Sequence, residues 1–155
     1  MAGRIEARLT ELGIALPAPT VPIANYVPFV LSGKLVVVSG QVPLAEGKLT
    51  HVGKLGAEIG LESGKAAARQ CLLNVLAHVR AAAGGDLDRV RRVVRLGGFI
   101  AATPDFTQHP QVMDGASDLA VAMFGEAGRH ARSTVGVASL PRNVPVEVEG
   151  MFELD

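Results

Sequence analysis

ARSTVGVASLPRNVPVEVEGMFEL (residues 131–154) contains the two segments on which our interpretation of the fold depends. Residues 132–139 and 146–154 both alternate apolar with polar side chains, the pattern of a half-buried strand. Residues 140–143 between them, Leu-Pro-Arg-Asn, have the composition of a turn. The stretch therefore predicts two neighbouring antiparallel strands at the end of the chain.

The pairing of these strands predicts which side chains share a face. If the turn closes a hairpin, Arg132 and Thr134 lie on one sheet face and the valines lie on the other. Glu147 and Glu149 of the last strand then lie on the same face as Arg132. We expect one apolar face toward the helices and one face that carries an arginine and carboxylates.

Two helices precede this pair. Residues 61–83 repeat apolar side chains at the 3.6-residue period of a helix, and Gly84-Gly85 ends the pattern. Residues 112–125 form the second predicted helix. Residues 89–102 between the helices read as a long strand.

The N-terminal part completes the expected order of elements. Residues 2–12 predict a short amphipathic helix, and the prolines of residues 14–24 predict an extended lead-in. Strands are expected at 26–31 and 34–39, with a short third strand at 48–52. Two or three strands, a helix, a strand, a helix and two strands indicate a single α+β domain over residues 1–155, with both helices on one sheet face and residues 1–24 as helix and lead-in.

Composition narrows the class of protein. The 155 residues are 48% hydrophobic, and 15 basic residues balance 15 acidic ones. This excludes general disorder and argues against a non-specific nucleic-acid binder, so no nucleic-acid partner is expected. The single cysteine, Cys71, cannot form an internal disulfide, and no apolar run reaches the ~20 residues of a membrane span. We expect a cytoplasmic protein that does not bind membranes.

Known motifs for cofactors and metals are missing from the sequence. It contains no phosphate-binding or dinucleotide-binding glycine motif and no H-E-x-x-H. The four histidines lack the spacing of metal ligands, so we expect no metal. Cys71, within the helix of residues 61–83, is expected to be a small buried hydrophobe. The arginines at 89–95 are expected to be a solvated strand end.

Three segments in order resemble the Rid family (YjgF-like, also called the endoribonuclease L-PSP family). The first is Asn-Tyr-Val-Pro at 25–28, followed by Val-Val-Ser-Gly-Gln-Val-Pro at 37–43. The second is Ala-Ala-Ala-Arg-Gln at 66–70 with the leucines near Asn74. The third is Ala-Arg-Ser-Thr-Val, then Leu-Pro, then Val-Glu-Val-Glu within residues 131–149.

The resemblance implies a chorismate-mutase-like fold. It also implies a homotrimer whose sheets form a central β-barrel, with ligand clefts between neighbouring subunits. Well-known members hydrolyse reactive enamines and imines to keto acids and ammonia without a cofactor. The partner implied for this chain is thus a small carboxylate-bearing substrate.

The family's functional residues carry over to five positions. Arg132 matches the arginine that holds the substrate carboxylate, for which a forked guanidinium is suited. Glu147 matches the glutamate that positions or activates water. Tyr26 matches the tyrosine that lines the cleft, and Ser39 and Gly40 match the strand end at its floor.

This sequence also departs from the family pattern. Thr134 stands where members usually have cysteine, and Gly136 where they often have glutamate. Ser117 or Asp118 takes the position of a helix asparagine. We expect Thr134 and Ser117 to line the cleft.

Simpler interpretations stay open at this point. Arg132 could form only a structural ion pair with Glu147 or Glu149, and His130 could be a loop histidine without a role. The altered lining also fits a trimeric module that binds a small carboxylate without turnover. An endoribonuclease is the least favoured reading, because net charge is zero and tyrosine occurs once.

Overall fold

A computed structural model describes residues 2–155, so the predicted domain start at residue 1 lies outside the described residues. Within residues 2–155 there are three helices and seven strands, in the predicted order with one addition, the short strand β3. They are α1 (Arg4–Glu11), β1 (Phe29–Ser32), β2 (Leu35–Gln41), β3 (Leu44–Ala45), β4 (Lys48–Leu49), α2 (Leu61–Ala82), β5 (Val90–Ala101), α3 (His109–Phe124), β6 (Ala131–Val137) and β7 (Val146–Leu154). Short 3-10 turns precede β5, follow α3 and precede β7.

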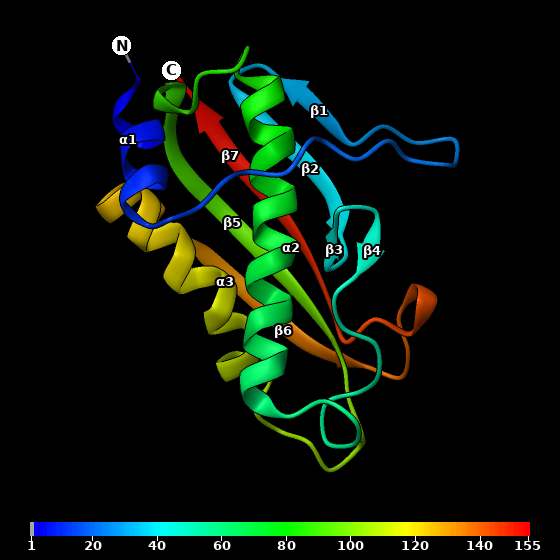
Figure 1. Cartoon of the computed structure of the whole chain (residues 1–155). Helices are drawn as coiled ribbons and strands as arrows, with labels where there is room; N and C mark the ends of the chain where they lie inside the picture. The colour runs from blue at the N-terminus through cyan, green and yellow to red at the C-terminus, as the bar shows by residue number, and fades with distance from the viewer. Residues whose placement is uncertain (1) are drawn as a thin grey trace.

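Five strands form one sheet in the order β1-β2-β7-β5-β6. β1 and β2 form a hairpin at Gly33, whose φ of 59° suits a residue without a Cβ. β7 pairs antiparallel with both β2 and β5, whereas β6 pairs parallel with β5. α2 and α3 lie across the same face of this sheet (Figure 1). The predicted α+β class and the placement of both helices on one face are confirmed.

The predicted hairpin between the last two strands is wrong. β5 lies between β6 and β7, so these two strands are not neighbours. Parallel strands need a crossover connection, and α3 supplies it between β5 and β6. Residues 138–145 then carry the chain past the end of β5 to its other side. The short connection of residues 140–143 suggests a hairpin, but connection length alone does not determine which strand lies beside which.

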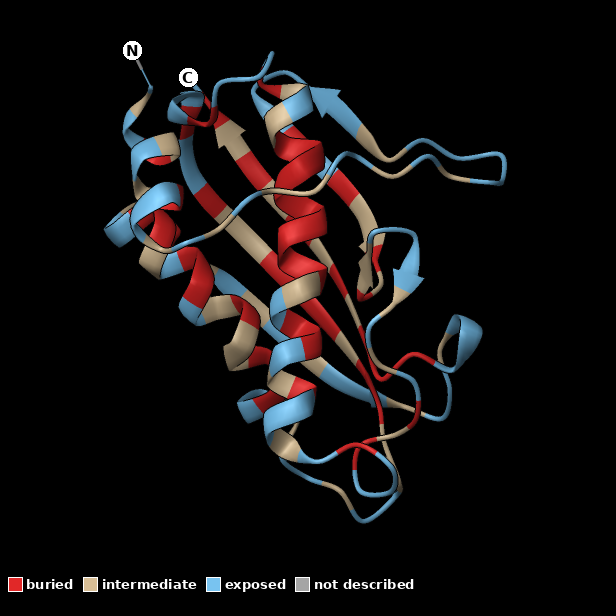
Figure 2. Cartoon of the chain, in the orientation of Figure 1, coloured by how far each residue is buried: buried red, intermediate tan, exposed pale blue. Residues whose placement is uncertain are grey.

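Helix α2 is buried around most of its circumference (Figure 2). The sheet lies on one side of it, α3 packs alongside, and the lead-in of residues 13–28 crosses its remaining side (Figure 1). Two polar side chains are enclosed there with hydrogen-bond partners. The Asn74 amide donates to the carbonyls of Val42 and Leu44, both at 2.9 Å, and His78 Nε2 lies 3.0 Å from the Thr20 hydroxyl. Burial lowers the pKa of His78.

Of three smaller expectations, two strand boundaries differ from the structure and one burial prediction is confirmed. β1 begins at Phe29, so Tyr26 lies in the bend before the strand and is 55% exposed. The third short strand is Lys48–Leu49, paired with β3. Cys71 is fully buried, as predicted, and burial raises the pKa of its thiol.

The sheet face opposite the helices is open and carries exposed valines beside ion pairs such as Arg95–Glu149. Within residues 2–155, no helix covers it. The strand register brings Val30 beside Val37 and Val135 beside Phe99 on this face. Val30 is 52% exposed and Val135 48%. Because β1 and β6 are also unpaired edges, this face has the character of a buried interface.

One carboxylate ties α1 to the rest of the fold. Asp88, in the turn before β5, accepts hydrogen bonds of 2.7 Å from the backbone N–H groups of Arg4 and Ile5. These are free donors in the first turn of α1, so Asp88 acts as its N-cap from outside the helix. The same bonds lower the pKa of Asp88.

We expect Asp88→Ala to lower the free energy of unfolding by about 1 kcal/mol, because it removes this cap. The stabilisation is present at neutral pH and is lost as the pH falls through the lowered pKa of Asp88. Urea unfolding at several pH values measures it. Glu126→Ala, which removes only an exposed ion pair with Arg129, is the control. Equal losses in both variants at neutral pH would contradict the capping role.

Candidate functional site

The predicted site residues fall into two groups within one chain. Arg132, Thr134 and Ser117 lie between β6 and α3, and we call this group the arginine cluster. Tyr26, Gly40 and Glu147 line a pocket at the end of β2, and we call this group the glutamate pocket. Ser39 adjoins the pocket, where its hydroxyl donates to the carbonyl of Val27 at 2.7 Å.

The strand register separates the two groups. In β5, Leu96 is the partner of Arg132 and faces the helices as a fully buried residue. Phe99 is the partner of Glu147, three positions further along the same strand. Side chains alternate along a strand, so positions an odd number apart point to opposite faces. Arg132 and Glu147 therefore lie on opposite sheet faces, and the prediction that they share one is wrong.

The ion pair considered between Arg132 and Glu147 or Glu149 is wrong for the same reason. Arg132 instead pairs with Asp114 of α3, with 2.8 Å between Nη1 and Oδ1. The same Nη1 donates to the hydroxyl of Ser117 at 3.2 Å. Glu149 pairs with Arg95 on the open face, at 3.5 Å. The guanidinium thus reaches toward α3 rather than across the open face of the sheet.

His130, which sequence reasoning left open as an unused loop residue, belongs to the arginine cluster. Its Nδ1 lies 2.6 Å from the carbonyl of Gly128, so this nitrogen carries the proton. Its Nε2 then accepts the hydroxyl proton of Ser117 at 2.9 Å. This leaves the oxygen of Ser117 free to accept from Arg132, and the histidine fixes the direction of that hydroxyl.

Sequence reasoning missed Asp114 as the partner of Arg132. The signal was available, because Asp114 and Ser117 are three residues apart on a predicted helix and so share one face. It could not be used while Arg132 was assigned to the opposite side of the sheet. The pairing of β6 with β5 brings this helix face over Arg132.

The two departures on β6 have structural consequences. The hydroxyl of Thr134 is buried and has no hydrogen-bond partner among the described residues. At Gly136, a Cβ would collide with Nε2 of His109, whose ring occupies the space above the strand. A glutamate at this position would therefore require His109 to move.

The glutamate pocket has a volume of about 320 Å³. The lead-in, the end of β2 and the turn before β7 all contribute to it. A Cβ at Gly40 would collide with Oε1 of Glu147, so the glycine makes room for the carboxylate. Arg142 and Gln41 also line the pocket. Burial raises the pKa of Glu147, and the nearby Glu149 raises it further.

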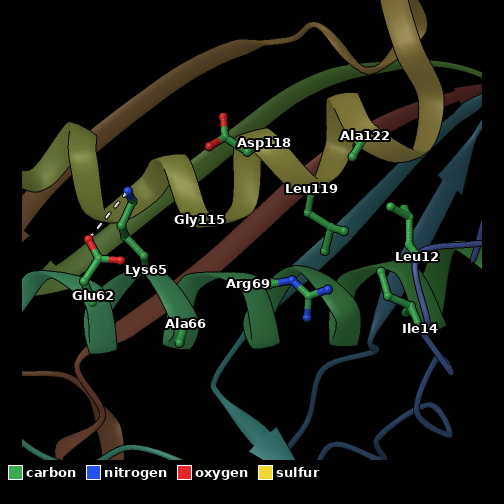
Figure 3. Close-up of a pocket in the computed structure, with 10 residues that line it drawn as sticks. All are labelled: Leu12, Ile14, Glu62, Lys65, Ala66, Arg69, Gly115, Asp118, Leu119 and Ala122. Atoms are coloured by element: carbon green, nitrogen blue, oxygen red, sulfur yellow. Dashed lines mark ion pairs between the residues drawn. The ribbon is translucent and has the colours of Figure 1, made fainter.

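A third hollow lies on the outer side of the helices, and of the residues considered for the site it contains only Asp118, the alternative to Ser117. Figure 3 shows this groove of about 440 Å³ between α2 and α3, closed at one end by Leu12 and Ile14. Lys65 pairs with Glu62 at 3.9 Å along its rim. Arg69 and Asp118 complete a set of two cations and two anions. The groove therefore has no excess charge with which to select a charged ligand.

Neither group holds the ligands for a metal. Residues 2–155 contain no cluster of three or more histidine, cysteine, aspartate or glutamate side chains suited to a metal ion. Within the same range, no helix has the length and apolar character needed to cross a membrane. Together the two groups offer two arginines, two carboxylates, hydroxyls and a histidine.

Comparison with known proteins gives consistent matches along the chain. The family model described as "YjgF/chorismate_mutase-like, putative endoribonuclease" matches residues 6–153. Protein TCP17 of Trypanosoma cruzi is 48% identical over 155 residues, covering 99% of this chain and 96% of that protein. The crystal structure of Atu1372 from Agrobacterium tumefaciens is 48% identical with a TM-score of 0.92, covering 97% of this chain and 92% of that one. Escherichia coli TdcF, crystallised with bound serine, is 26% identical with a TM-score of 0.63, covering 91% and 96%.

Because the pKa of Glu147 is raised in the folded state, its negative charge should lower the free energy of unfolding at neutral pH. At low pH the Glu147 carboxyl is protonated in both the folded and the unfolded state. Because its pKa is higher in the folded state, the folded state keeps the proton to a higher pH, and ionisation above that pH lowers the free energy of unfolding. Glu147→Gln should therefore be more stable than the wild type at pH 7 and equal to it near the acid end of the folded range. Urea unfolding at fixed protein concentration measures this.

Glu153→Gln is the matched control on the same strand, because Glu153 forms only a long ion pair with Arg92 at 3.9 Å. A Glu147→Gln variant that is less stable than the wild type at pH 7 would show that the charged form is favoured, against the burial argument.

Proposed function

The chain belongs to the YjgF (Rid) family, and from this membership we propose that it is a homotrimeric hydrolase of reactive enamines and imines. Its substrates are 2-imino acids, and its products are 2-oxo acids and ammonia. The observation that carries the proposal is the separation of the arginine cluster from the glutamate pocket. Residues that the family uses together lie on opposite sheet faces, so a complete site needs two copies of the chain.

The open sheet face supports the trimer. Val30, Val37 and Val135 are exposed on it, and the edges β1 and β6 have unpaired backbone groups. Burial of such a face against other copies removes apolar surface from water. Closure of the three sheets into a barrel would bring the β6 edge of one copy close to the β1–β2 side of its neighbour. That arrangement joins the arginine cluster of one copy to the glutamate pocket of the next.

Arg132 is proposed to hold the substrate carboxylate. Its Nη1 is engaged by Asp114 and Ser117, while Nε and Nη2 make no hydrogen bond within residues 2–155. These two nitrogens form a fork suited to a carboxylate. The serine bound in TdcF is a small carboxylate of this kind.

Glu147 is proposed to handle water and protons. A carboxylate with a raised pKa is a better base near neutral pH than an exposed one. It takes a proton from water as the oxygen bonds to the carbon of the protonated imine and the C=N π electrons pass to nitrogen, which gives a neutral aminol. Protonated Glu147 then returns this proton to the amino group. As the carbon–nitrogen bond breaks, ammonia leaves, the hydroxyl proton passes to the Glu147 carboxylate and the carbonyl forms.

A non-catalytic binding module is the second candidate. The observation in its favour is that Asp114 already neutralises Arg132, and Thr134 replaces the family cysteine beside it. Thermal-shift screening with small carboxylates distinguishes the two, because a module would be stabilised by a ligand while imino acids were left unhydrolysed.

An endoribonuclease is the third and least supported reading. The family description contains that word, but the chain has equal numbers of acidic and basic residues and one exposed tyrosine. A surface that tracks RNA needs excess positive charge and aromatic stacking.

Arg132→Ala should reduce kcat/KM for imino-acid hydrolysis by about 100-fold, the loss expected for a charged hydrogen-bonded contact. Arg132→Lys should lose less, because a lysine keeps the charge without the fork. The assay measures ammonia and keto acid released from freshly generated 2-iminobutanoate. Arg129→Ala, whose exposed guanidinium pairs with Glu126, is the control. Wild-type activity in Arg132→Ala would overturn the proposal.

A further inference from the structure

The guanidinium of Arg132 shares its site with an internal carboxylate. The Asp114 side chain is 44% exposed, whereas that of Arg132 is 24% exposed. The carboxylate therefore stands on the solvent side of the pair. A ligand that approaches Arg132 meets a negative charge next to the positive one.

Two further contacts fix the direction of this pair. Ser117 lies one turn along α3 from Asp114, and its hydroxyl oxygen accepts a hydrogen bond from Arg132 Nη1 at 3.2 Å. The same hydroxyl donates its hydrogen bond to Nε2 of His130. Both acceptors engage the same nitrogen. The Nε and Nη2 positions of Arg132 and the Oδ2 of Asp114 have no hydrogen-bond partner within residues 2–155. A donor fork and a carboxylate oxygen thus remain free within one ion pair.

Such a pair discriminates between carboxylates by what their neighbouring carbon carries. A carboxylate whose 2-position is an oxo group presents an acceptor to Asp114, and the two oxygens repel each other. A carboxylate whose 2-position carries a protonated nitrogen presents N–H donors and a positive charge to Oδ2. Hydrogen bonds between charged groups are stronger than those between neutral groups. Losing one weakens binding more in a partly buried site than at the exposed surface, because water screens the charges less there.

We propose that Asp114 makes the arginine cluster select carboxylates with a protonated 2-nitrogen, an iminium or an ammonium group, over carboxylates with an uncharged 2-oxo group. This inference rests on the proposed role of Arg132 in binding the ligand carboxylate. It gives the hydrolase two advantages. The iminium form is the electrophile that water attacks, and the 2-oxo product, which lacks the N–H donors, leaves the site readily.

The competing explanation is that Asp114 only holds Arg132 in position. In that case its replacement changes the affinity of all carboxylates in the same direction. Asp114→Asn separates the two explanations, because the amide oxygen still accepts from Arg132 Nη1 while the negative charge is removed.

The experiment is isothermal titration of the full-length protein with two probes of equal size, 2-aminobutanoate and 2-oxobutanoate, at pH 7. For Asp114→Asn we expect 2-aminobutanoate to bind about tenfold more weakly, while 2-oxobutanoate binds at least as tightly as to the wild type. Asp118→Asn is the matched control, because this carboxylate is four residues along the same helix and lines the outer groove. It should change neither affinity.

The Arg132→Ala variant tests the underlying proposal separately, since it should weaken both probes. The first case is that Arg132→Ala weakens the binding of both probes. If Asp114→Asn then shifts the affinities for both probes in the same direction, or leaves that for 2-aminobutanoate unchanged, the role of Asp114 is overturned and that of Arg132 stands. If Arg132→Ala leaves both affinities unchanged, or the wild type binds neither probe, the proposed function itself is overturned.

Discussion

Strand β5 pairs with β7 on one side and with β6 on the other, and this pairing determines where each candidate side chain lies. Side chains alternate between the two sheet faces along β5. Residues of β6 and β7 that pair with adjacent β5 residues therefore also point to opposite faces. Arg132 is directed toward α3, where Asp114 and Ser117 meet it. Glu147 is directed to the open face and the end of β2. A shift of one residue in the pairing of β6 with β5 would move Arg132 to the open face, and the same shift of β7 would move Glu147 to the helix side. The latter shift would also expose the buried valines of β7.

The same constraint links the fold to assembly. One sheet face is covered by α2 and α3, and the buried residues of both helices form a continuous core with it (Figure 2). The other face has apolar side chains without cover within the described chain. The two groups of functional residues lie toward different sides of the sheet, so the proposed trimer would bury that face and complete the site in one step. On this account, stability of the assembly and activity depend on the same contacts.

Much of the fold could be predicted from periodicity. The 3.6-residue repeat of residues 61–83 corresponds to α2 at Leu61–Ala82, and the alternation in residues 146–154 corresponds to β7. The pairing of β6 could not be taken from alternation alone, because alternation shows which residues share a face of one strand and not which strand lies beside it. The length of the connection suggests a hairpin, whereas the helix between β5 and β6 permits the parallel pair that the structure shows.

The sequence supplied candidate site residues but not their arrangement in space. The resemblance identified Arg132 and Glu147, but their separation depends on the register with β5. Asp114 contacts Arg132 directly, and His130 reaches it through Ser117. Such contacts can be predicted from a sequence only once it is known which helix face lies beside the strand. The buried, unpartnered hydroxyl of Thr134 is likewise a consequence of packing under α3 rather than of local sequence.

Subunit complementation is the most direct test of a site divided between copies. Arg132→Ala and Glu147→Gln would each be inactive alone, and the two variants would be unfolded, mixed in equal amounts and refolded together. If Arg132 of one copy works with Glu147 of the next, about a quarter of the sites in randomly mixed trimers contain both residues, and about a quarter of wild-type activity returns. If the mixture stays as inactive as the separate variants, the site is not shared between subunits and the account is contradicted.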